Sequence, residues 1–451
     1  MAKSPHRRAI RWLREQLPLL VSNGVITPEA SRAIQRHYDS SEARQSNFGF
    51  VLLAIVGSAL IGAGIVLLIE HNWDELSRAA RSTIAFLPLI AAQALGVFVL
   101  WRRNESKPWR ESVAISDIAA VATAIALISQ TYQLQGTFAD FMQLWLILII
   151  PVVYLFRTTV GAVGYIIGTV AWLFAKADWL RNQSSHLFFW LFLLAVGPYY
   201  LALLRRNRYD REAAALSILL VGAATIGLGF TTTSAQSNLG GIAFGGFFTV
   251  VYLCGMRFFQ SIESQRLPAL ALLGGFGVGV TAIVLSFEPM WHMTPASSWA
   301  LEGSGRAVAI AIELFFPLVA IALLAWDYTQ RRRVAFSLTA AVMPLVTALA
   351  WMIANLAPAT KRTQDSSYSL MAALIFDAYA LILGSELMAR GVRANSVLRA
   401  NFGLIIITGL ALSRFFDSDL DFVTRGLGFI LVGAGFLVAN VIFFKQRRVA
   451  A

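Results

Sequence analysis

Long apolar runs dominate this chain from residue 48 onward. Each run is close to the ~20 residues that a helix needs to cross the hydrocarbon core of a bilayer. Hydrophobic residues make up 57% of the chain and charged residues only 14%, whereas a soluble domain carries about 25% charged residues. The pattern predicts an all-α, polytopic membrane helical bundle of about fourteen spans: 48–69, 82–101, 113–133, 139–156, 159–175, 187–204, 213–230, 240–258, 268–287, 307–326, 334–355, 369–389, 398–416 and 426–444.

The fourth and fifth runs, 139–156 and 159–175, are the least regular part of this pattern. Both are short, and only Arg157 and two threonines separate them. Two interpretations therefore stay open for this stretch: two complete spans, or one re-entrant pair of helices.

The distribution of basic residues predicts the orientation of the spans. With the N-terminus in the cytoplasm and the spans alternating, 28 of the 37 lysines and arginines fall in cytoplasmic segments and nine outside. Cytoplasmic loops of membrane proteins carry such an excess. We therefore expect a multi-pass membrane protein with an even number of spans and both termini cytoplasmic. The net charge of +12 then reflects topology anchors and attraction to anionic lipid on the cytoplasmic side, and no nucleic-acid partner is expected.

The segment before the first apolar run has the character of a small cytosolic domain. Residues 6–22 carry apolar positions at helical spacing, and Gly24 suits the left-handed conformation of a helix C-cap. Thr27 and Pro28 are typical of the start of a second helix, which we expect to run to about Tyr38. The sequence thus predicts two domains, a cytosolic helical hairpin with linker at 1–46 and a transmembrane domain at 47–451. The hairpin is a candidate surface for a cytosolic protein partner.

Among the acidic residues within predicted spans, three lie farthest from the span ends: Asp117, Glu313 and Asp377. A charge at the centre of a spanning helix is costly, so such residues are candidates for substrate binding or proton coupling. Pro317 cannot donate a hydrogen bond to the Glu313 carbonyl, so a kink is expected beside that carboxyl group. The alternative is that each carboxyl group is hydrogen-bonded and holds helices together.

A polar segment follows the first apolar run, and the predicted topology places it on the outer face. Its candidate functional residues on the outer face are Glu70, His71, Asn72, Trp73 and Asp74. They could bind a cation or a lipid headgroup, or they could cap the first helical hairpin. A single histidine beside a few carboxylates is a poor metal site. Because Walker A, HExxH, GxSxG and CxxC motifs are absent, no catalytic residue, metal site or cofactor is predicted.

Glycines occur at GxxxG spacing within three apolar runs, as Gly164/Gly168, Gly241/Gly245 and Gly275/Gly279. Small residues at this spacing let helices approach closely in lipid. We expect close packing between helices of the same chain, with homodimerisation as the alternative.

Several short stretches resemble one known family. Trp12-Leu13, the run from Gly24 to Glu29, and His37-Tyr38 are followed by Gly62-x-Gly64, by the run from His71 to Leu76, and by the run from Ser129 to Gln133. Over about residues 10–140 the chain resembles the domain-of-unknown-function 2157 family. The resemblance implies a polytopic inner-membrane protein of bacteria with no established activity. It marks 70–76 and 129–133, including Gln130 and Tyr132, as signature positions, and no catalytic residue is carried over.

Three hypotheses of function follow. The first is a transporter or lipid-handling permease that uses intramembrane carboxylates. The second is a membrane scaffold or envelope sensor, without enzymatic activity, whose cytosolic hairpin binds a partner. The third is a membrane-embedded transferase acting on lipid-linked substrates, with acids such as Glu70, Asp74 and Asp140 at the outer interface.

Overall fold

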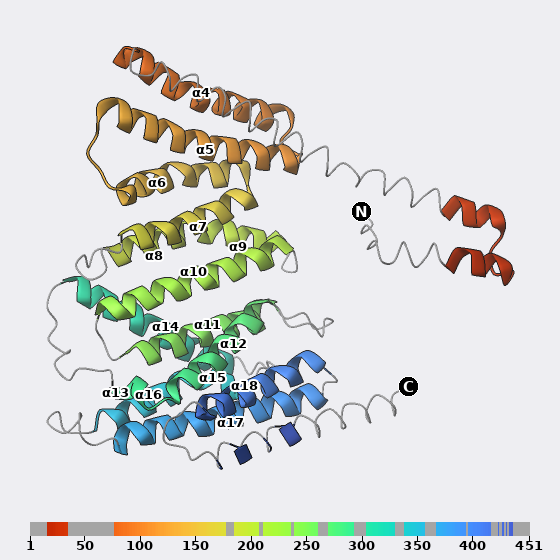
Figure 1. The fold of residues 1–451 in the computed structure, drawn as a ribbon, viewed down its shortest axis with the longest axis vertical. Coiled ribbons are helices and arrows are strands. Elements are labelled where there is room, and N and C mark those ends of the chain that lie inside the picture. The colour runs from red at the N-terminus through yellow and green to blue at the C-terminus, as the bar shows by residue number, and fades with distance from the viewer. Residues whose placement is uncertain are drawn as a thin grey trace. The chain divides into compact units, whose positions relative to one another are not determined.

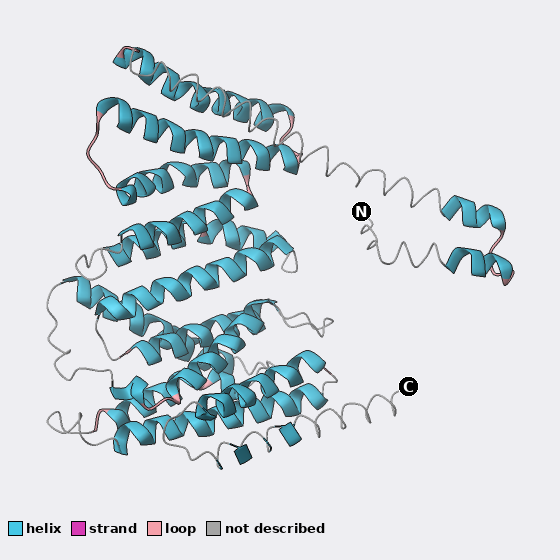
Figure 2. Ribbon diagram, viewed as in Figure 1, coloured by secondary structure: helices cyan, strands magenta, loops and turns pink. Residues whose placement is uncertain are grey.

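The structure is a computed structural model of the chain. It describes residues 16–34, 76–176, 185–206, 211–235, 239–259, 269–292, 304–329, 338–356, 367–393 and 396–415, with a few positions between 423 and 435. Every regular element in these ranges is a helix, and no strand occurs among them (Figure 2). The all-α prediction is confirmed.

The chain divides into two compact units, Met1–Thr83 and Ile84–Ala451. In the first unit, residues 16–22 and 28–34 are helical. Gly24 between them has φ +70°, and the Ala30 N–H donates to Thr27 Oγ1 at 3.2 Å. The predicted caps at Gly24 and Thr27 are therefore confirmed. The other parts of the predicted hairpin, 6–15 and 35–38, lie outside the described residues, and so does the first apolar run with the polar segment behind it.

The helices from residue 78 onward follow the predicted apolar runs (Figure 1). They are α4 (Arg78–Arg102), α5 (Lys107–Tyr132), α6 (Phe138–Phe156), α7 (Thr159–Lys176), α8 (Ser185–Ala195), α9 (Gly197–Arg206), α10 (Arg211–Ala235), α11 (Gly240–Phe259), α12 (Ala269–Leu285), α13 (Pro289–His292), α14 (Ser304–Thr329), α15 (Leu338–Ala341), α16 (Met343–Ala354), α17 (Ser367–Arg393) and α18 (Val397–Phe415).

Within the described ranges, nine helical segments are long and apolar enough to cross a membrane, and α12 and α16 are shorter apolar helices. The nine include α6 and α7 as separate helices, so each of the two irregular runs has the length of a full span. Most of the last predicted span, 426–444, lies outside the described residues. The structure therefore supports a membrane protein with several spanning helices.

Prolines divide two of the predicted spans. The run 187–204 contains α8 and α9, which meet just before Pro198. The described part of the run 334–355 contains α15 and α16, which meet just before Pro344. Proline has no N–H to donate, and its ring obstructs the preceding turn. Pro317 does not have this effect, because α14 continues through it from Ser304 to Thr329.

The hydrophobic core has two large clusters of buried side chains that meet on α11. The first cluster joins α6, α7, α8 and α10 to the Phe247 and Val251 positions of α11. The second joins α12, α16, α17 and α18 to Tyr252 and Leu253, the next residues along the same helix. Because α11 contributes side chains to both clusters, this helix connects the two halves of the bundle (Figure 1).

Candidate functional site

A pocket of about 850 Å³ lies between α4, α5 and α6. The loop that connects α5 to α6 forms one end of it. Its lining comes from three consecutive helices and their connection: Phe86, Leu89, Gln93, Val121, Ala124, Ile125, Ala126, Ile128, Ser129, Gln130, Leu134, Gln135, Gly136, Thr137, Phe138, Asp140, Phe141, Leu144 and Leu148.

The walls of the pocket are apolar, and the helical repeat explains which residues form them. On α5, Val121, Ala124, Ile125 and Ile128 follow the i, i+3, i+4, i+7 spacing that places side chains on one face. Leu89 of α4 and Leu144 and Leu148 of α6 complete these walls.

The three helices close against each other at the opposite end from the loop. Val99 of α4, Val113 of α5 and Val152 and Phe156 of α6 form a buried cluster there. Gly96 makes this contact possible, since a Cβ at that position would lie 2.8 Å from Phe156 Cζ. The cluster is the closed base of the pocket. Gln93, one helical turn from Gly96, is the polar residue nearest to it.

The other end of the pocket is polar. We call Ser129, Gln130, Gln135, Thr137 and Asp140 the polar end. They meet there because α5 finishes at Tyr132 and α6 begins at Phe138, so the last turn of one helix faces the first turn of the next.

Asp140 is already engaged within the protein. Its Oδ2 accepts hydrogen bonds from the Thr137 N–H at 3.0 Å and from the Thr137 hydroxyl at 2.8 Å, and the Asp140 N–H donates to Thr137 Oγ1 at 3.3 Å. This is a capping box, which satisfies backbone donors at the start of α6. Lys176 Nζ lies 3.1 Å from Asp140 Oδ1. The carboxylate therefore has both a structural role and a cationic partner.

Of the two predicted helix signature positions, the structure places Gln130 in the lining of the pocket. Tyr132 is half exposed and is not among the lining residues. The other predicted signature residues, Glu70 to Asp74, lie outside the described residues. The sequence analysis did not identify Gln93 as a lining residue. It could have been recognised as a candidate, because its amide interrupts an otherwise apolar stretch of α4.

Asp117 lies one helical turn beyond Val121, on the side of the closed base. Its side chain is 7% exposed, and Oδ1 has no hydrogen-bond partner among the described residues. It does not line the pocket. A buried polar atom without a partner is unusual and energetically costly. Of the three predicted intramembrane acids, Asp117 is thus the one adjacent to the pocket along its helix.

Asp377 of α17 is held by an arginine. Arg414 of α18 approaches it with Nη2 2.5 Å from Oδ2 and Nε 3.3 Å from Oδ1, and Nη2 also donates to the Ser286 carbonyl at 2.8 Å. This arrangement joins α17, α18 and the end of α12. In the count of basic residues, Arg414 was one of the nine expected outside the cytoplasm, and it was not identified as a partner of Asp377.

Glu313 of α14 is completely buried, on a helix that packs against α10 and α11. The helix of Asp117 packs against α6 and α7, and that of Asp377 against α12, α16 and α18. The three predicted acids therefore occupy three separate helix interfaces.

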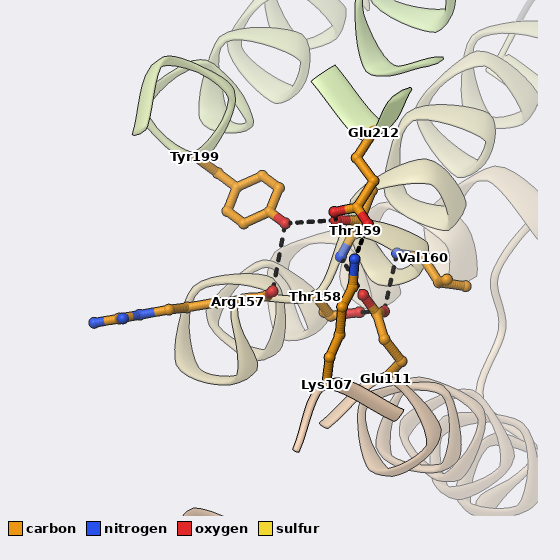
Figure 3. Close-up of polar contacts among 8 residues, drawn as sticks. All are labelled: Lys107, Glu111, Arg157, Thr158, Thr159, Val160, Tyr199 and Glu212. Atoms are coloured by element: carbon orange, nitrogen blue, oxygen red, sulfur yellow. Dashed lines mark hydrogen bonds and ion pairs between the residues drawn. The ribbon is translucent and has the colours of Figure 1, made fainter. Parts of the chain in front are cut away.

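A second polar cluster, which the sequence did not reveal, caps the start of α7 (Figure 3). Glu111 of α5 accepts the Thr159 N–H at 3.0 Å and the Val160 N–H at 3.1 Å, and the Thr158 hydroxyl also donates to this carboxylate. These backbone donors have no partner within the helix. A negative charge at this position also interacts favourably with the positive end of the helix dipole.

The same cluster extends to α9 and α10 (Figure 3). The Thr159 hydroxyl donates to Glu212 at 3.0 Å and lies 3.1 Å from the Tyr199 hydroxyl, which donates to the Arg157 carbonyl at 3.4 Å. Lys107 forms an ion pair with Glu212. The contacts join four helices and satisfy one another, so we assign this cluster a structural role.

Replacing Glu111 by glutamine is therefore expected to destabilise the protein by about 1–3 kcal/mol, because the amide nitrogen cannot accept a backbone hydrogen bond at the start of α7. The midpoint of thermal unfolding of the purified protein measures this effect. Glu105→Gln is the matched control, since it removes the same charge from the exposed α4–α5 loop. Equal midpoints for the two variants would contradict the capping role.

Comparisons with curated proteins and with solved structures found no match. The comparison with protein families did find a match, and the matched region includes every residue that lines the pocket. Residues 18–162 match the family described as "Predicted membrane protein (DUF2157)", which confirms the resemblance that the sequence analysis stated.

Proposed function

We propose that this protein is a lipid-handling permease and that the pocket between α4, α5 and α6 binds one amphipathic, lipid-like molecule. The apolar part of the ligand contacts the walls around Leu89, Ile125 and Leu144, and its head group contacts the polar end. The observation that carries this proposal is the combination, in one cavity, of apolar walls and a cluster of polar groups at one end.

The size of the pocket supports a small ligand. Binding sites for small molecules are mostly apolar clefts of about 300–1,000 Å³ with a few polar groups that fix the orientation of the ligand. At about 850 Å³ the pocket lies within this range, and its polar groups are gathered mainly at one end.

The exposure of the pocket walls supports entry from the bilayer. Phe86, Leu144 and Leu148 line the pocket and are 43%, 46% and 47% exposed. Side chains of this kind on a spanning helix contact acyl chains, because apolar surface is stable in the hydrocarbon region. A lipid chain can therefore pass between the membrane and the pocket without crossing water.

The proposal includes the predicted topology of about fourteen spans in a bacterial inner membrane with both termini cytoplasmic. The polar end then faces outward, and Asp117 is the intramembrane carboxylate best placed to couple lipid movement to a proton. Glu313 and Asp377 support the helix bundle. In this proposal residues 1–46 lie in the cytoplasm and engage a protein partner, and anionic lipid contacts the basic residues of the cytoplasmic side.

Photo-crosslinking of the full-length protein in lipid vesicles tests the proposal. The probe is an uncharged lipid, diacylglycerol, with a diazirine in one acyl chain, and mass spectrometry locates the labelled peptides. We expect labelling of residues 121–148. Ala124→Phe, which places a ring in the pocket, is expected to lower that labelling about tenfold, as a loss of ~1.4 kcal/mol in binding would.

Ile115→Phe is the matched control, because Ile115 lies on the same helix, is 48% exposed and does not line the pocket. Ala126→Phe changes a second lining residue at an exposed position, in case the first variant is unstable. Equal labelling of the wild type, both pocket variants and the control would exclude the pocket as the binding site.

A further inference from the structure

The polar end of the pocket contains amide and hydroxyl groups and almost no charge. Its residues come from the last turn of α5 (Ser129, Gln130), the connecting loop (Gln135, Thr137) and the first turn of α6 (Asp140). Serine, threonine and glutamine side chains both donate and accept hydrogen bonds. No lysine, arginine or histidine occurs among the residues that line the pocket.

The one ionised side chain in the lining does not supply a free charge. Asp140 accepts two hydrogen bonds from Thr137 and one from Lys176, at 2.8–3.1 Å. Lys176 in turn lies outside the lining and is paired with Asp140. The two charges offset each other, so the net charge at the polar end is close to zero.

A neutral polar end disfavours an anionic head group. A phosphate taken out of water needs charge-assisted hydrogen bonds, which arginine and lysine typically provide. A hydroxyl-bearing head group, by contrast, has the same mixture of donors and acceptors as the glutamine, serine and threonine side chains around it.

The aromatic side chains near this end fit the same type of head group. Phe138 and Phe141 both line the pocket, and their ring centroids are 6.0 Å apart in a stacked arrangement. The face of an aromatic ring carries partial negative charge and attracts the partly positive C–H groups of a neighbouring molecule. A sugar ring presents C–H groups on its face and hydroxyls around its edge.

We infer that the pocket selects lipids with an uncharged, hydroxyl-rich head group, and that its ligand is a neutral glycolipid rather than an anionic phospholipid. This inference rests on the proposed function, since it names the class of lipid that the same pocket takes. Gln130 is the principal hydrogen-bonding residue for the head group, because it lies in the last turn of α5 and its side chain is exposed.

Three photoactivatable lipids with identical diazirine-bearing acyl chains test the inference on the full-length protein in vesicles. They are a glucosyl-diacylglycerol, the corresponding diacylglycerol and the corresponding phosphatidylglycerol. We expect the glucosyl lipid to label residues 121–148 about tenfold more than phosphatidylglycerol. Diacylglycerol distinguishes a requirement for the sugar from a simple exclusion of charge, and labelling equal to that of the glucosyl lipid would overturn the assignment to a glycolipid.

Two variants change the head-group preference in opposite ways. Gln130→Leu is expected to lower the labelling by the glucosyl lipid about fivefold, the change that one neutral hydrogen bond accounts for. Gln130→Arg is expected to shift the preference toward phosphatidylglycerol, because it adds a cation at the polar end. Gln143→Leu is the control, since Gln143 lies on α6 outside the lining.

The outcomes separate this inference from the proposed function. Equal labelling of the pocket by all three lipids, or a preference for phosphatidylglycerol in the wild type, overturns the inference and leaves lipid binding in place. Absence of pocket labelling by every lipid overturns both.

Discussion

Replacing Asp327 by alanine is expected to destabilise the protein by about 3–5 kcal/mol, because it removes the carboxylate that pairs with the buried Arg257 guanidinium. Arg257 Nη1 lies 2.7 Å from Asp327 Oδ1, and the two side chains are only 7% and 4% exposed. The guanidinium also lies over the ring of Trp326, 4.2 Å from its centroid. The pair joins α11 to α14, and α11 is the helix that both core clusters share.

Thermal unfolding of the purified protein measures this loss, and a double variant identifies its cause. Arg257→Met combined with Asp327→Leu removes both charges and keeps comparable volume, so it is expected to recover most of the lost stability. Arg390→Met is the control. Arg390 pairs with Glu386 one turn away on α17 at 41% exposure, where an ion pair contributes about 0–1 kcal/mol. If Asp327→Ala proved as stable as Arg390→Met, or if the double variant were no better than Asp327→Ala, the buried charge would not be the cause.

The sequence predicted where helices occur much better than where they break. The expected spans 82–101, 139–156 and 159–175 correspond closely to α4, α6 and α7, because a long apolar run is a property of the segment itself. The sequence did not predict the breaks before Pro198 and Pro344. It predicted a kink at Pro317, but α14 continues through that residue. Whether a proline ends a helix depends on neighbouring helices, which a single segment does not reveal.

Partners across the bundle could not be predicted from sequence spacing. Asp377 was recognised as an intramembrane acid, but Arg414 is 37 residues away and was assigned to topology. Arg257 was treated in the same way, although it pairs with Asp327, 70 residues away. The positive-inside pattern counts basic residues by position along the chain, so it does not separate anchors from buried partners.

The pocket illustrates the same limit. Gln130 was identified as a signature position and does line the cavity, but the cavity itself depends on the spacing of three helices. That spacing is set at the closed base, by Gly96, Val99 and Phe156, far from the residues that form the polar end. Composition and periodicity describe one helix at a time and contain no information on such a gap.

Glycine spacing predicted part of the close packing. A Cβ at Gly168 would lie 2.8 Å from Trp145, and a Cβ at Gly241, Gly245 or Gly279 would lie 3.0 Å from a side chain of another helix. Close packing within the chain is therefore confirmed at these four positions. A Cβ at Gly164 would meet no side chain or neighbouring helix within 4 Å.

The closest backbone contacts between α11 and α12 lie at Gly255 and Gly274, which the GxxxG pattern did not include. A Cβ at Gly274 would lie 2.3 Å from the backbone nitrogen of Tyr252, and a Cβ at Gly255 would lie 2.3 Å from the backbone nitrogen of Ala271. The two helices therefore pack backbone against backbone at Gly255 and Gly274.

Gly274→Ala is consequently expected to destabilise the protein by about 3 kcal/mol, the upper end of the range for overpacking, because backbone atoms cannot move aside as a flexible side chain can. Gly275→Ala is the matched control on the same helix. Its Cβ would lie 3.7 Å from the nearest atom, an ordinary contact with Tyr252. Alanine forms helices better than glycine by ~1 kcal/mol, so this control is expected to be neutral or slightly stabilising. The thermal unfolding midpoints of the two variants measure this difference in stability. If Gly274→Ala proved as stable as Gly275→Ala, α11 and α12 would not approach each other this closely.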